Sequence, residues 1–230
     1  MKIDRLILGE FETNCYVLRK ESIGLRNSDA ADDCLVIDPG LEAGELIDFL
    51  NRQKLNPIAV VLTHGHIDHI AGVAVLRDRF PDIKVYIHKL DAEMLTEPQT
   101  NLSAMTGAAF TTEPEDFSLE EQSIIELAGI KLLVLHTPGH TPGGISLYSP
   151  APASSDTGRS GGKEEGIAFV GDTLFAGSIG RTDFPNGSMS QLLNSIKEKL
   201  FTLPDETKVY PGHGPATTIA EEKAHNPFFR

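Results

Sequence analysis

The chain has 230 residues, of which 40% are hydrophobic and 23% are charged, so its composition is globular rather than disordered or fibrous. Its formal net charge of -13 argues against nucleic acid and anionic membranes as partners, because both are themselves negatively charged. A chain of this length commonly folds around one core, so we expect a single domain over residues 1–230.

The N-terminal stretch MKIDRLILGEFETNC has no signal-peptide pattern. No run in the sequence approaches the roughly 20 apolar residues that cross a bilayer. We therefore expect a soluble, cytoplasmic protein. The two cysteines, Cys15 and Cys34, lie in apolar stretches and are expected to be small buried side chains rather than a redox pair.

The first half of the chain alternates between strand-like and helix-like segments. Apolar runs predict strands at 16–19, 34–40, 57–63 and 84–88. Helices are predicted at 42–50 and at 69–80, where an apolar stripe is formed by Ile70, Val73, Leu76 and Phe80.

The second half follows a poorly patterned stretch at 97–118. Strands are predicted at 123–127, 131–137, 144–149, 167–172 and 208–212, with a helix at 189–201. Strands and helices in both halves favour two sheets covered by helices. The segment 149–166 is rich in Ser, Gly and Pro and is predicted to be a mobile surface loop inserted between two strands.

The stretch VLTHGHIDHIAG places three histidines and an aspartate on a strand-to-helix connection. His64 and His66 are two residues apart in extended backbone and should point to the same side, whereas the adjacent Asp68 and His69 can reach a second position. Imidazole and carboxylate ligands suit zinc, iron or manganese. The spacing favours two metal ions over a polar loop with surface histidines.

Further metal-compatible donors follow three later strands. His140 lies in the turn HTPGHTPGG, Asp172 ends the strand IAFVGD, and His213 lies in the turn of KVYPGHGP. Together with the first cluster they predict a rim of donors at four strand ends.

These motifs, THGHIDHIAG, IDPG, HTPGHTPGG, GDTLF and YPGHGP, resemble in their order those of the metallo-β-lactamase superfamily, over nearly the whole chain. The resemblance implies an α/β fold, the αββα sandwich of two mixed β-sheets flanked by helices, with metals at one edge of the sheets. It implies one ion held by His64, His66 and His140, a second held by Asp68, His69 and His213, and Asp172 as a bridge. Asp38 in IDPG would orient a ligand histidine.

Such a centre would hold two divalent ions, with zinc expected first and iron or manganese as the other candidates. A metal-bridging hydroxide at neutral pH would attack an ester-like carbonyl, so we expect a metal-dependent hydrolase. Asp68 is the expected catalytic carboxylate, which holds or accepts the proton of the water.

The stretches FAGSIGRTDFPNGSMSQLL and VYPGHGPATTIAEEKAHNPFF resemble the short bacterial glyoxalase II-like (hydroxyacylglutathione) hydrolases, which cleave thioesters such as S-lactoylglutathione. The resemblance implies a small-molecule thioester as substrate, and gives Arg181 a role in holding the glutathione part. Longer glyoxalase II enzymes complete that site with a C-terminal helical extension. Only 17 residues follow His213 here, which leaves glutathione specificity open.

The main alternative is a persulfide dioxygenase, a relative that shares GRTDF and would hold one iron on His64, His140 and Asp172. A nuclease of the same fold is disfavoured by the negative charge. A non-enzymatic metal-binding protein is disfavoured because it needs no open two-metal site. The remaining histidines, His88, His136 and His225, lie outside the motifs and are not predicted as ligands. The oligomeric state is not predicted.

Overall fold

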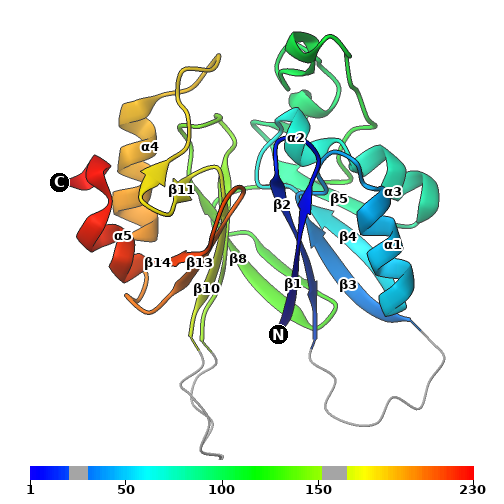
Figure 1. Cartoon of the computed structure of the whole chain (residues 1–230), viewed down its shortest axis with the longest axis horizontal. Helices are drawn as coiled ribbons and strands as arrows, with labels where there is room; N and C mark the ends of the chain where they lie inside the picture. Colours follow the sequence, from blue (N-terminus) through cyan, green and yellow to red (C-terminus); the bar gives the residue numbers. More distant parts are fainter. Residues whose placement is uncertain (21–30, 152–164) are drawn as a thin grey trace, which may run out of the picture.

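The computed structural model describes residues 1–20, 31–151 and 165–230. Two six-stranded sheets pack face to face, and helices cover the outer face of each (Figure 1). Both sheets contain parallel and antiparallel pairs. The predicted αββα sandwich of two mixed sheets is therefore confirmed.

The first sheet follows the chain order β1-β2-β3-β4-β5-β6. Its strands are β1 (Lys2–Leu8), β2 (Thr13–Arg19), β3 (Asp32–Ile37), β4 (Leu55–Val61), β5 (Lys84–His88) and β6 (Phe117–Leu119). Strand β1 was not among the predicted strands because it is an exposed antiparallel partner of β2 with charged residues at Lys2, Asp4 and Arg5.

Helix α1 (Gly44–Gln53) lies where a helix was predicted. The single helix predicted over 69–80 is wrong, because the chain forms α2 (Ile67–Ile70) and α3 (Val73–Arg79) instead. The break comes at Gly72, whose backbone N–H donates to the Pro39 carbonyl at 2.6 Å. A Cβ at Gly72 would come within 2.5 Å of that oxygen. The close approach fixes the metal-motif loop against the end of β3.

The second sheet has the order β14-β13-β10-β9-β8-β7. Its strands are β7 (Ile124–Leu127), β8 (Ile130–His136), β9 (Ile145–Ser149), β10 (Ile167–Gly171), β13 (Lys208–Pro211) and β14 (Thr217–Thr218). A small hairpin, β11 (Leu174–Phe175) and β12 (Ser178–Ile179), follows β10. Its strands are too short to give a sequence pattern.

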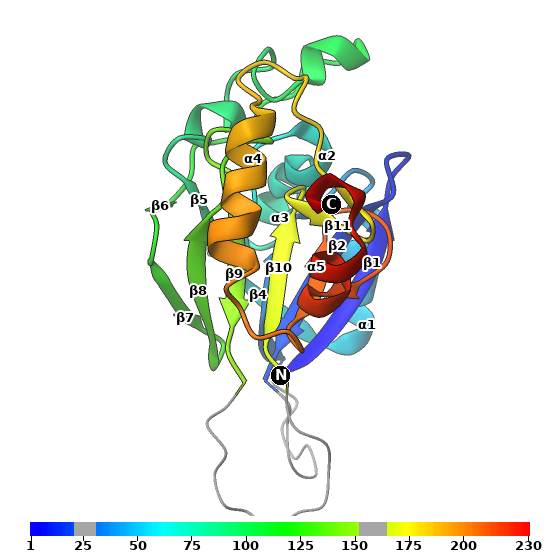
Figure 2. The same cartoon turned by 90° about the vertical axis from the view of Figure 1, so that its left-hand side faces the viewer.

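Helix α4 (Met189–Ser195) continues as a π-helical turn η3 (Ile196–Leu200), and with α5 (Ile219–His225) it covers the second sheet (Figure 2). Three short 3-10 turns complete the described elements: η1 (Ala92–Leu95), η2 (Ser103–Thr106) and η4 (Pro227–Phe229). The first two lie in or beside the stretch without clear pattern.

The core between the sheets is built around aromatic rings. Phe169 of β10 is fully buried, with its ring centroid 5.1 Å from that of Tyr16 and 5.3 Å from that of Tyr210. The Tyr16 hydroxyl donates to the carbonyl of Pro211 at 2.7 Å, so the first sheet is bonded to the end of β13. This core fixes the relative position of the strand ends in both sheets.

Both cysteines are buried and free. Burial raises the pKa of Cys34 to about 12 and that of Cys15 well above its ordinary value, so neither is a reactive thiolate. The predicted mobile loop at 149–166 falls mostly on 152–164, outside the described residues. No helix in the described part of the chain is long and apolar enough to cross a membrane.

We expect Phe169→Ala to reduce the free energy of unfolding by about 3–5 kcal/mol, because it opens a cavity between the sheets. Urea denaturation would measure the loss. Phe228→Ala is the matched control, since that ring is 43% exposed, and it should cost less than about 1 kcal/mol. Equal losses in the two variants would contradict a core centred on Phe169.

Candidate metal centre

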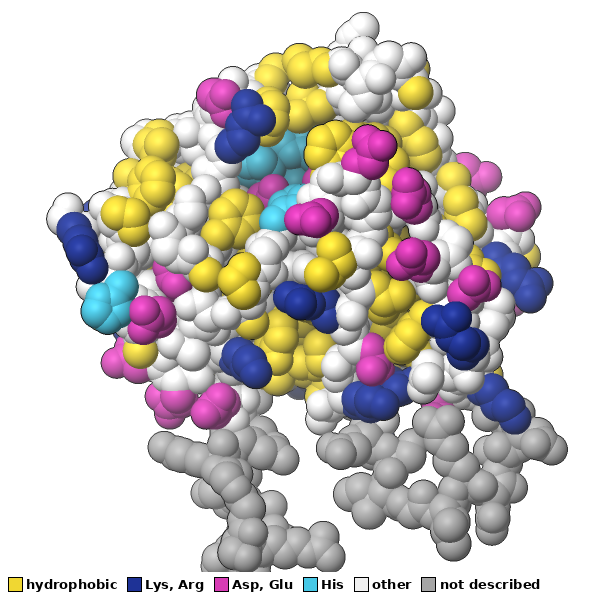
Figure 3. Space-filling view, viewed as in Figure 1, with side chains coloured by type: hydrophobic (Ala, Val, Ile, Leu, Met, Phe, Trp, Pro, Cys, Tyr) yellow, Lys and Arg dark blue, Asp and Glu magenta, His cyan; other side chains and the backbone are white. Residues whose placement is uncertain are grey.

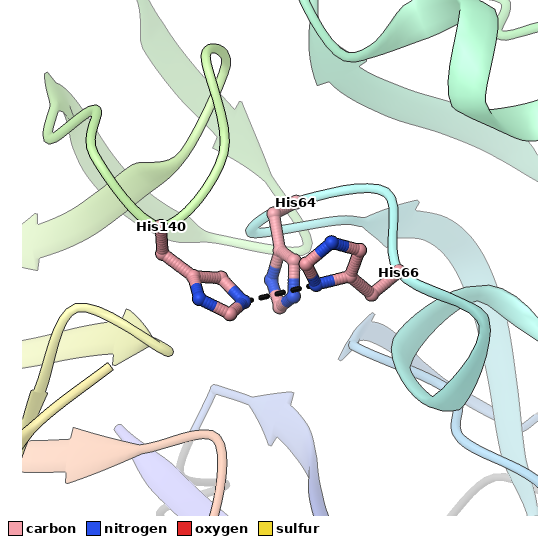
Figure 4. Close-up of side chains that lie close together, drawn as sticks. All are labelled: His64, His66 and His140. Atoms are coloured by element: carbon pink, nitrogen blue, oxygen red, sulfur yellow. Dashed lines mark hydrogen bonds between the residues drawn. The ribbon is translucent and has the colours of Figure 1, made fainter. Parts of the chain in front are cut away.

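The predicted donors come together at one edge of the sandwich. They lie on the loops that follow β4, β8, β10 and β13, so both sheets contribute. In Figure 4, His140 approaches from one loop while His64 and His66 approach from another, with the three rings facing a common point. The structure therefore brings together residues that are up to 149 positions apart, from His64 to His213.

The seven donors form three overlapping groups whose ligand atoms lie within 4.8 Å of one another. These groups are His64, His66 and His140; His64, His69 and Asp172; and Asp68, His69 and His213. Asp172 lies between the outer groups, since its Oδ2 is 3.6 Å from Nε2 of His140 and 3.7 Å from Nε2 of His213. This is the position that a bridging carboxylate needs.

The outer ring nitrogen of four histidines is already bonded to the protein. Nδ1 of His69 lies 2.9 Å from the Asp38 carboxylate, Nδ1 of His140 lies 2.7 Å from the Arg181 carbonyl, and Nδ1 of His213 lies 2.9 Å from the Phe11 carbonyl. Nδ1 of His64 lies 3.2 Å from the Thr63 hydroxyl. These acceptors assign the ring proton to Nδ1, which leaves each Nε2 lone pair directed inward.

The inward atoms fit metal ions and are poorly explained without them. His64 Nε2 and Asp172 Oδ1 are buried with no hydrogen-bond partner. Nδ1 of His66 and Nε2 of His140 are 2.9 Å apart, a hydrogen bond in which the N–H of His66 donates to the lone pair of His140. Unpartnered buried acceptors such as His64 Nε2 and Asp172 Oδ1 are costly unless a cation lies among them. The donor set and its geometry therefore fit a metal centre.

The electrostatics of the centre favour cations. Burial lowers the pKa of His66 to about 3, helped by His140, so that ring is neutral. Burial acts in the same direction at His69, but the carboxylates of Asp68, Asp172 and Asp38 outweigh it and raise the pKa of His69 well above its usual range. The same negative field would stabilise a metal ion at Nε2 of His69 in place of a second ring proton.

Asp38 is placed where the sequence analysis expected it. Its carboxylate accepts hydrogen bonds from the backbone N–H of Thr63 at 2.8 Å and from the Thr63 hydroxyl at 2.7 Å, besides the contact with His69. The backbone of Asp38 has a φ of +50°, which turns the chain sharply at the end of β3. Thr63 was not predicted as a site residue, although it is the first residue of the motif THGHIDHIAG.

Asn14 is a second residue that the sequence analysis missed. Its side chain donates to the carbonyls of Pro211 and Gly214, each at 2.9 Å, and its backbone N–H donates to Gly212 at 2.7 Å. These bonds tie the loop of His213 to the start of β2. The sequence signal for this role was an Asn next to the apolar run of ETNCYVL, because a polar side chain that is buried there needs hydrogen-bond partners.

Glycines allow the loops to approach this closely. A Cβ at Gly212 would overlap the Asp172 carboxylate and lie 2.7 Å from Cε1 of His69. The glycine before His213 is thus required by the packing of the centre, which explains that part of the YPGHGP motif.

A pocket of about 420 Å³ opens onto the centre. Its other walls are apolar and include Phe11, Leu102, Met105, Phe175 and Phe184. Figure 3 shows this hollow as a group of histidines bordered by hydrophobic side chains. None of these five residues was predicted, because isolated apolar residues on loops leave no periodic pattern.

Arg181 lines the pocket but is already paired. Its guanidinium makes two hydrogen bonds to the Asp183 carboxylate, at 3.0 and 2.8 Å, and lies 4.1 Å from the centroid of the Phe184 ring. Among the described residues that line the pocket it is the one Lys or Arg. A substrate carboxylate would therefore have to compete with Asp183 for it.

The three histidines that were not predicted as ligands lie outside the donor groups. His88 and His136 stack on each other with ring centroids 4.2 Å apart, and the His225 side chain is 62% exposed.

Comparison with known proteins places these features in a family. A family model described as the Metallo-beta-lactamase superfamily matches residues 8–213. The chain is 36% identical to the probable metallo-hydrolase YqgX of Bacillus subtilis over 229 residues, covering 99% of this chain and 97% of that protein. It is 34% identical to the hydroxyacylglutathione hydrolase GloC of Haemophilus influenzae over 232 residues, covering 99% and 98%.

Solved structures give a consistent result. BLEG-1 B3 metallo-beta-lactamase superposes with a TM-score of 0.84 at 39% identity, with 99% of each chain covered. TTHA1623 in a di-iron-bound form gives 0.77 at 35% identity, covering 98% of this chain and 99% of that one. ETHE1 from Myxococcus xanthus gives 0.70 at 31% identity, covering 99% and 84%.

We expect elemental analysis to find about two metal ions per chain, because the donors form two complete groups joined by Asp172. Asp172→Ala should lower that number and abolish turnover. His225→Ala is the matched control and should keep the wild-type metal content, since that ring lies outside the centre. Wild-type metal content and activity in Asp172→Ala would rule out the bridging role.

Proposed function

The chain belongs to the metallo-beta-lactamase superfamily and is a metallo-hydrolase, and we propose that it cleaves a small-molecule thioester or related ester of the S-lactoylglutathione kind. The observation that carries the proposal is the pair of donor groups, with Asp172 between them, that open onto one pocket. The likeness to GloC supports a thioester as the bond that is cleaved.

In this proposal His64, His66 and His140 would hold one divalent ion and Asp68, His69 and His213 would hold the other, with the carboxylate of Asp172 placed between the two groups. Two such ions, when bound, supply an activated water at neutral pH and polarise a carbonyl oxygen. Zinc is our first candidate, and the di-iron form of TTHA1623 supports iron as the second.

Asp68 is the proposed proton carrier. It lines the pocket, and its Oδ2 receives a hydrogen bond from the Thr13 hydroxyl at 3.3 Å, which orients the carboxylate. Attack of water on the thioester carbon forms a C–O bond and breaks the C–S bond, and one proton must pass to the departing sulfur. A carboxylate that lines the pocket can take that proton and return it.

The protein positions the substrate through its pocket walls. Phe184 lies with its ring centroid 5.4 Å from that of His66, and Phe175 lies 6.3 Å from His213, so aromatic rings flank both sides of the centre. Apolar walls exclude bulk water and strengthen the electrostatic interactions within the site. They suit the uncharged acyl end of a thioester.

A persulfide dioxygenase is the second candidate, favoured by the likeness to ETHE1. A single iron on His64, His140 and Asp172 would leave His66, Asp68, His69 and His213 converging without an ion among them. Filled ligand positions do not by themselves separate the two enzymes, so the choice of the hydrolase rests on the stretch YPGHGP, which resembles the hydrolase form of this motif.

A paired assay on one preparation tests this choice. We expect cleavage of S-lactoylglutathione, followed at the thioester absorbance, and no oxygen uptake with glutathione persulfide. The reason is that two-metal hydrolysis consumes water and needs no oxidant. Oxygen uptake without thioester cleavage, from a protein that holds one iron, would establish the dioxygenase instead.

The pairing of Arg181 with Asp183 yields a separate prediction about glutathione. Asp183→Asn should lower the KM for S-lactoylglutathione by about two- to fivefold, because it removes an exposed competitor for the guanidinium. Arg181→Ala should raise that KM. Steady-state kinetics would measure both changes.

Asp205→Asn is the matched control, because Asp205 forms a similar exposed pair with Lys223 but lies on the loop before β13, at the opposite end from His213. It should leave the KM unchanged. Wild-type KM values in both Arg181→Ala and Asp183→Asn would remove Arg181 from substrate binding.

A further inference from the structure

Asp91 is a fully buried carboxylate that no motif pointed to. It follows β5 and precedes the turn η1, so it belongs to the half of the chain that forms the first sheet. Burying a carboxylate is expensive unless hydrogen bonds or a cation compensate. No described Lys, Arg or His makes an ion pair with it, so the compensation comes from neutral donors.

The hydrogen-bond donors lie on the two loops that carry the metal-ligand group of His64, His66 and His140. Oδ1 of Asp91 accepts a hydrogen bond from the N–H of Gly143 at 2.6 Å, and Oδ2 accepts one from the Thr141 hydroxyl at 2.6 Å. Oδ2 also accepts a longer bond from the N–H of Gly65 at 3.3 Å. Gly65 lies between His64 and His66, whereas Thr141 and Gly143 directly follow His140.

The carboxylate therefore joins a loop of the first sheet to a loop of the second. The fit is tight, because a Cβ at Gly143 would lie 2.6 Å from Oδ1 of Asp91, and one at Gly65 would overlap Met94 of η1. Across this junction Nδ1 of His66 and Nε2 of His140 are held 2.9 Å apart.

The two sheets are also joined nearby without Asp91. The N–H of Ile145 donates to the Thr63 carbonyl at 2.9 Å, and the aromatic core lies below. Loss of Asp91 would thus leave the sandwich in place and loosen the two loops above it.

We propose that Asp91 is a positioning residue that sets the metal affinity of the group formed by His64, His66 and His140. Asp38 acts in the same way for the group of Asp68, His69 and His213, through its direct contact with His69. Each donor group then has its own buried carboxylate. Asp38 contacts the ligand His69 directly, whereas Asp91 binds the loops that carry His64, His66 and His140. The proposal rests on the two-metal centre of the proposed function.

The test is a titration of the metal-free protein with zinc in competition with a chromophoric chelator, which gives the affinity of each position. In Asp91→Asn an NH2 group replaces one carboxylate oxygen, and this group cannot accept the hydrogen bond that the oxygen accepts in the wild-type protein. We expect one zinc affinity to fall by about tenfold or more and the other to stay near its wild-type value. After dialysis that variant should retain about one zinc per chain.

The position that weakens is identified in a second background. His140→Ala already disables the first group, so adding Asp91→Asn should not lower the affinity of the remaining zinc. Adding Asp38→Asn to His140→Ala should lower it. Thr141→Val, which removes one donor and keeps the side-chain shape, should weaken the same position by a smaller factor than Asp91→Asn.

Asp116→Asn is the matched control. Asp116 also accepts a backbone N–H, that of Val85 at 2.9 Å, but at the other end of β5. It should leave both zinc affinities unchanged.

The positioning role would be overturned if both zinc affinities of Asp91→Asn equalled those of the wild-type protein. It would also be overturned if both affinities fell equally, which would indicate a general loss of structure. Thr141→Val decides the matter if Asp91→Asn does not fold, since wild-type affinities there also overturn it. If the wild-type protein binds no zinc, iron or manganese, the proposed function fails instead, which separates the two outcomes.

Discussion

The centre depends most on the hydrogen bonds that the buried carboxylate of Asp38 accepts from Thr63 and His69. Through them the end of β3 fixes the end of β4, from which the metal motif starts, and fixes the proton of His69 on Nδ1. The sharp backbone turn at Asp38, with its positive φ, brings the carboxylate beneath the motif. A ring that could rotate or exchange its proton would present a lone pair to the centre only part of the time.

The fold and the donors were predictable from the sequence for the same reason. Buried strands appear in the sequence as apolar runs. The polar residues directly after such runs lie at the same edge of the sandwich. His64, His140, Asp172 and His213 could therefore be placed together before their distances were known. Strand β1 and the short β11–β12 hairpin were missed because half-exposed or two-residue strands carry no such run. The break at Gly72 was missed because a helical stripe continues through it, and only the approach of Pro39 excludes the helix.

The supporting residues could not be predicted, since their role is defined by contacts between distant segments. Asp91 is one acid among the 33 Asp and Glu residues of the chain, and only the fold shows that it bonds to both Gly65 and Thr141. The pairing of Arg181 with Asp183 is local in sequence, but its meaning depends on the pocket that the guanidinium faces. Spacing identifies ligands, whereas the network that orients them follows from packing.

The centre by itself does not choose the substrate. Structures similar to this chain carry the names of a metallo-beta-lactamase, a di-iron protein and ETHE1, so one arrangement of strand ends accommodates different chemistry. What differs must lie in the number of ions held and in the walls around them. In this protein the His140 loop is held against the loop of His64 and His66, and the pocket walls are apolar side chains with one basic residue that is already paired. In the proposed function, selectivity for the thiol part of the thioester therefore rests on residues outside the donor set, where an exposed acid such as Asp183 competes with the substrate for Arg181.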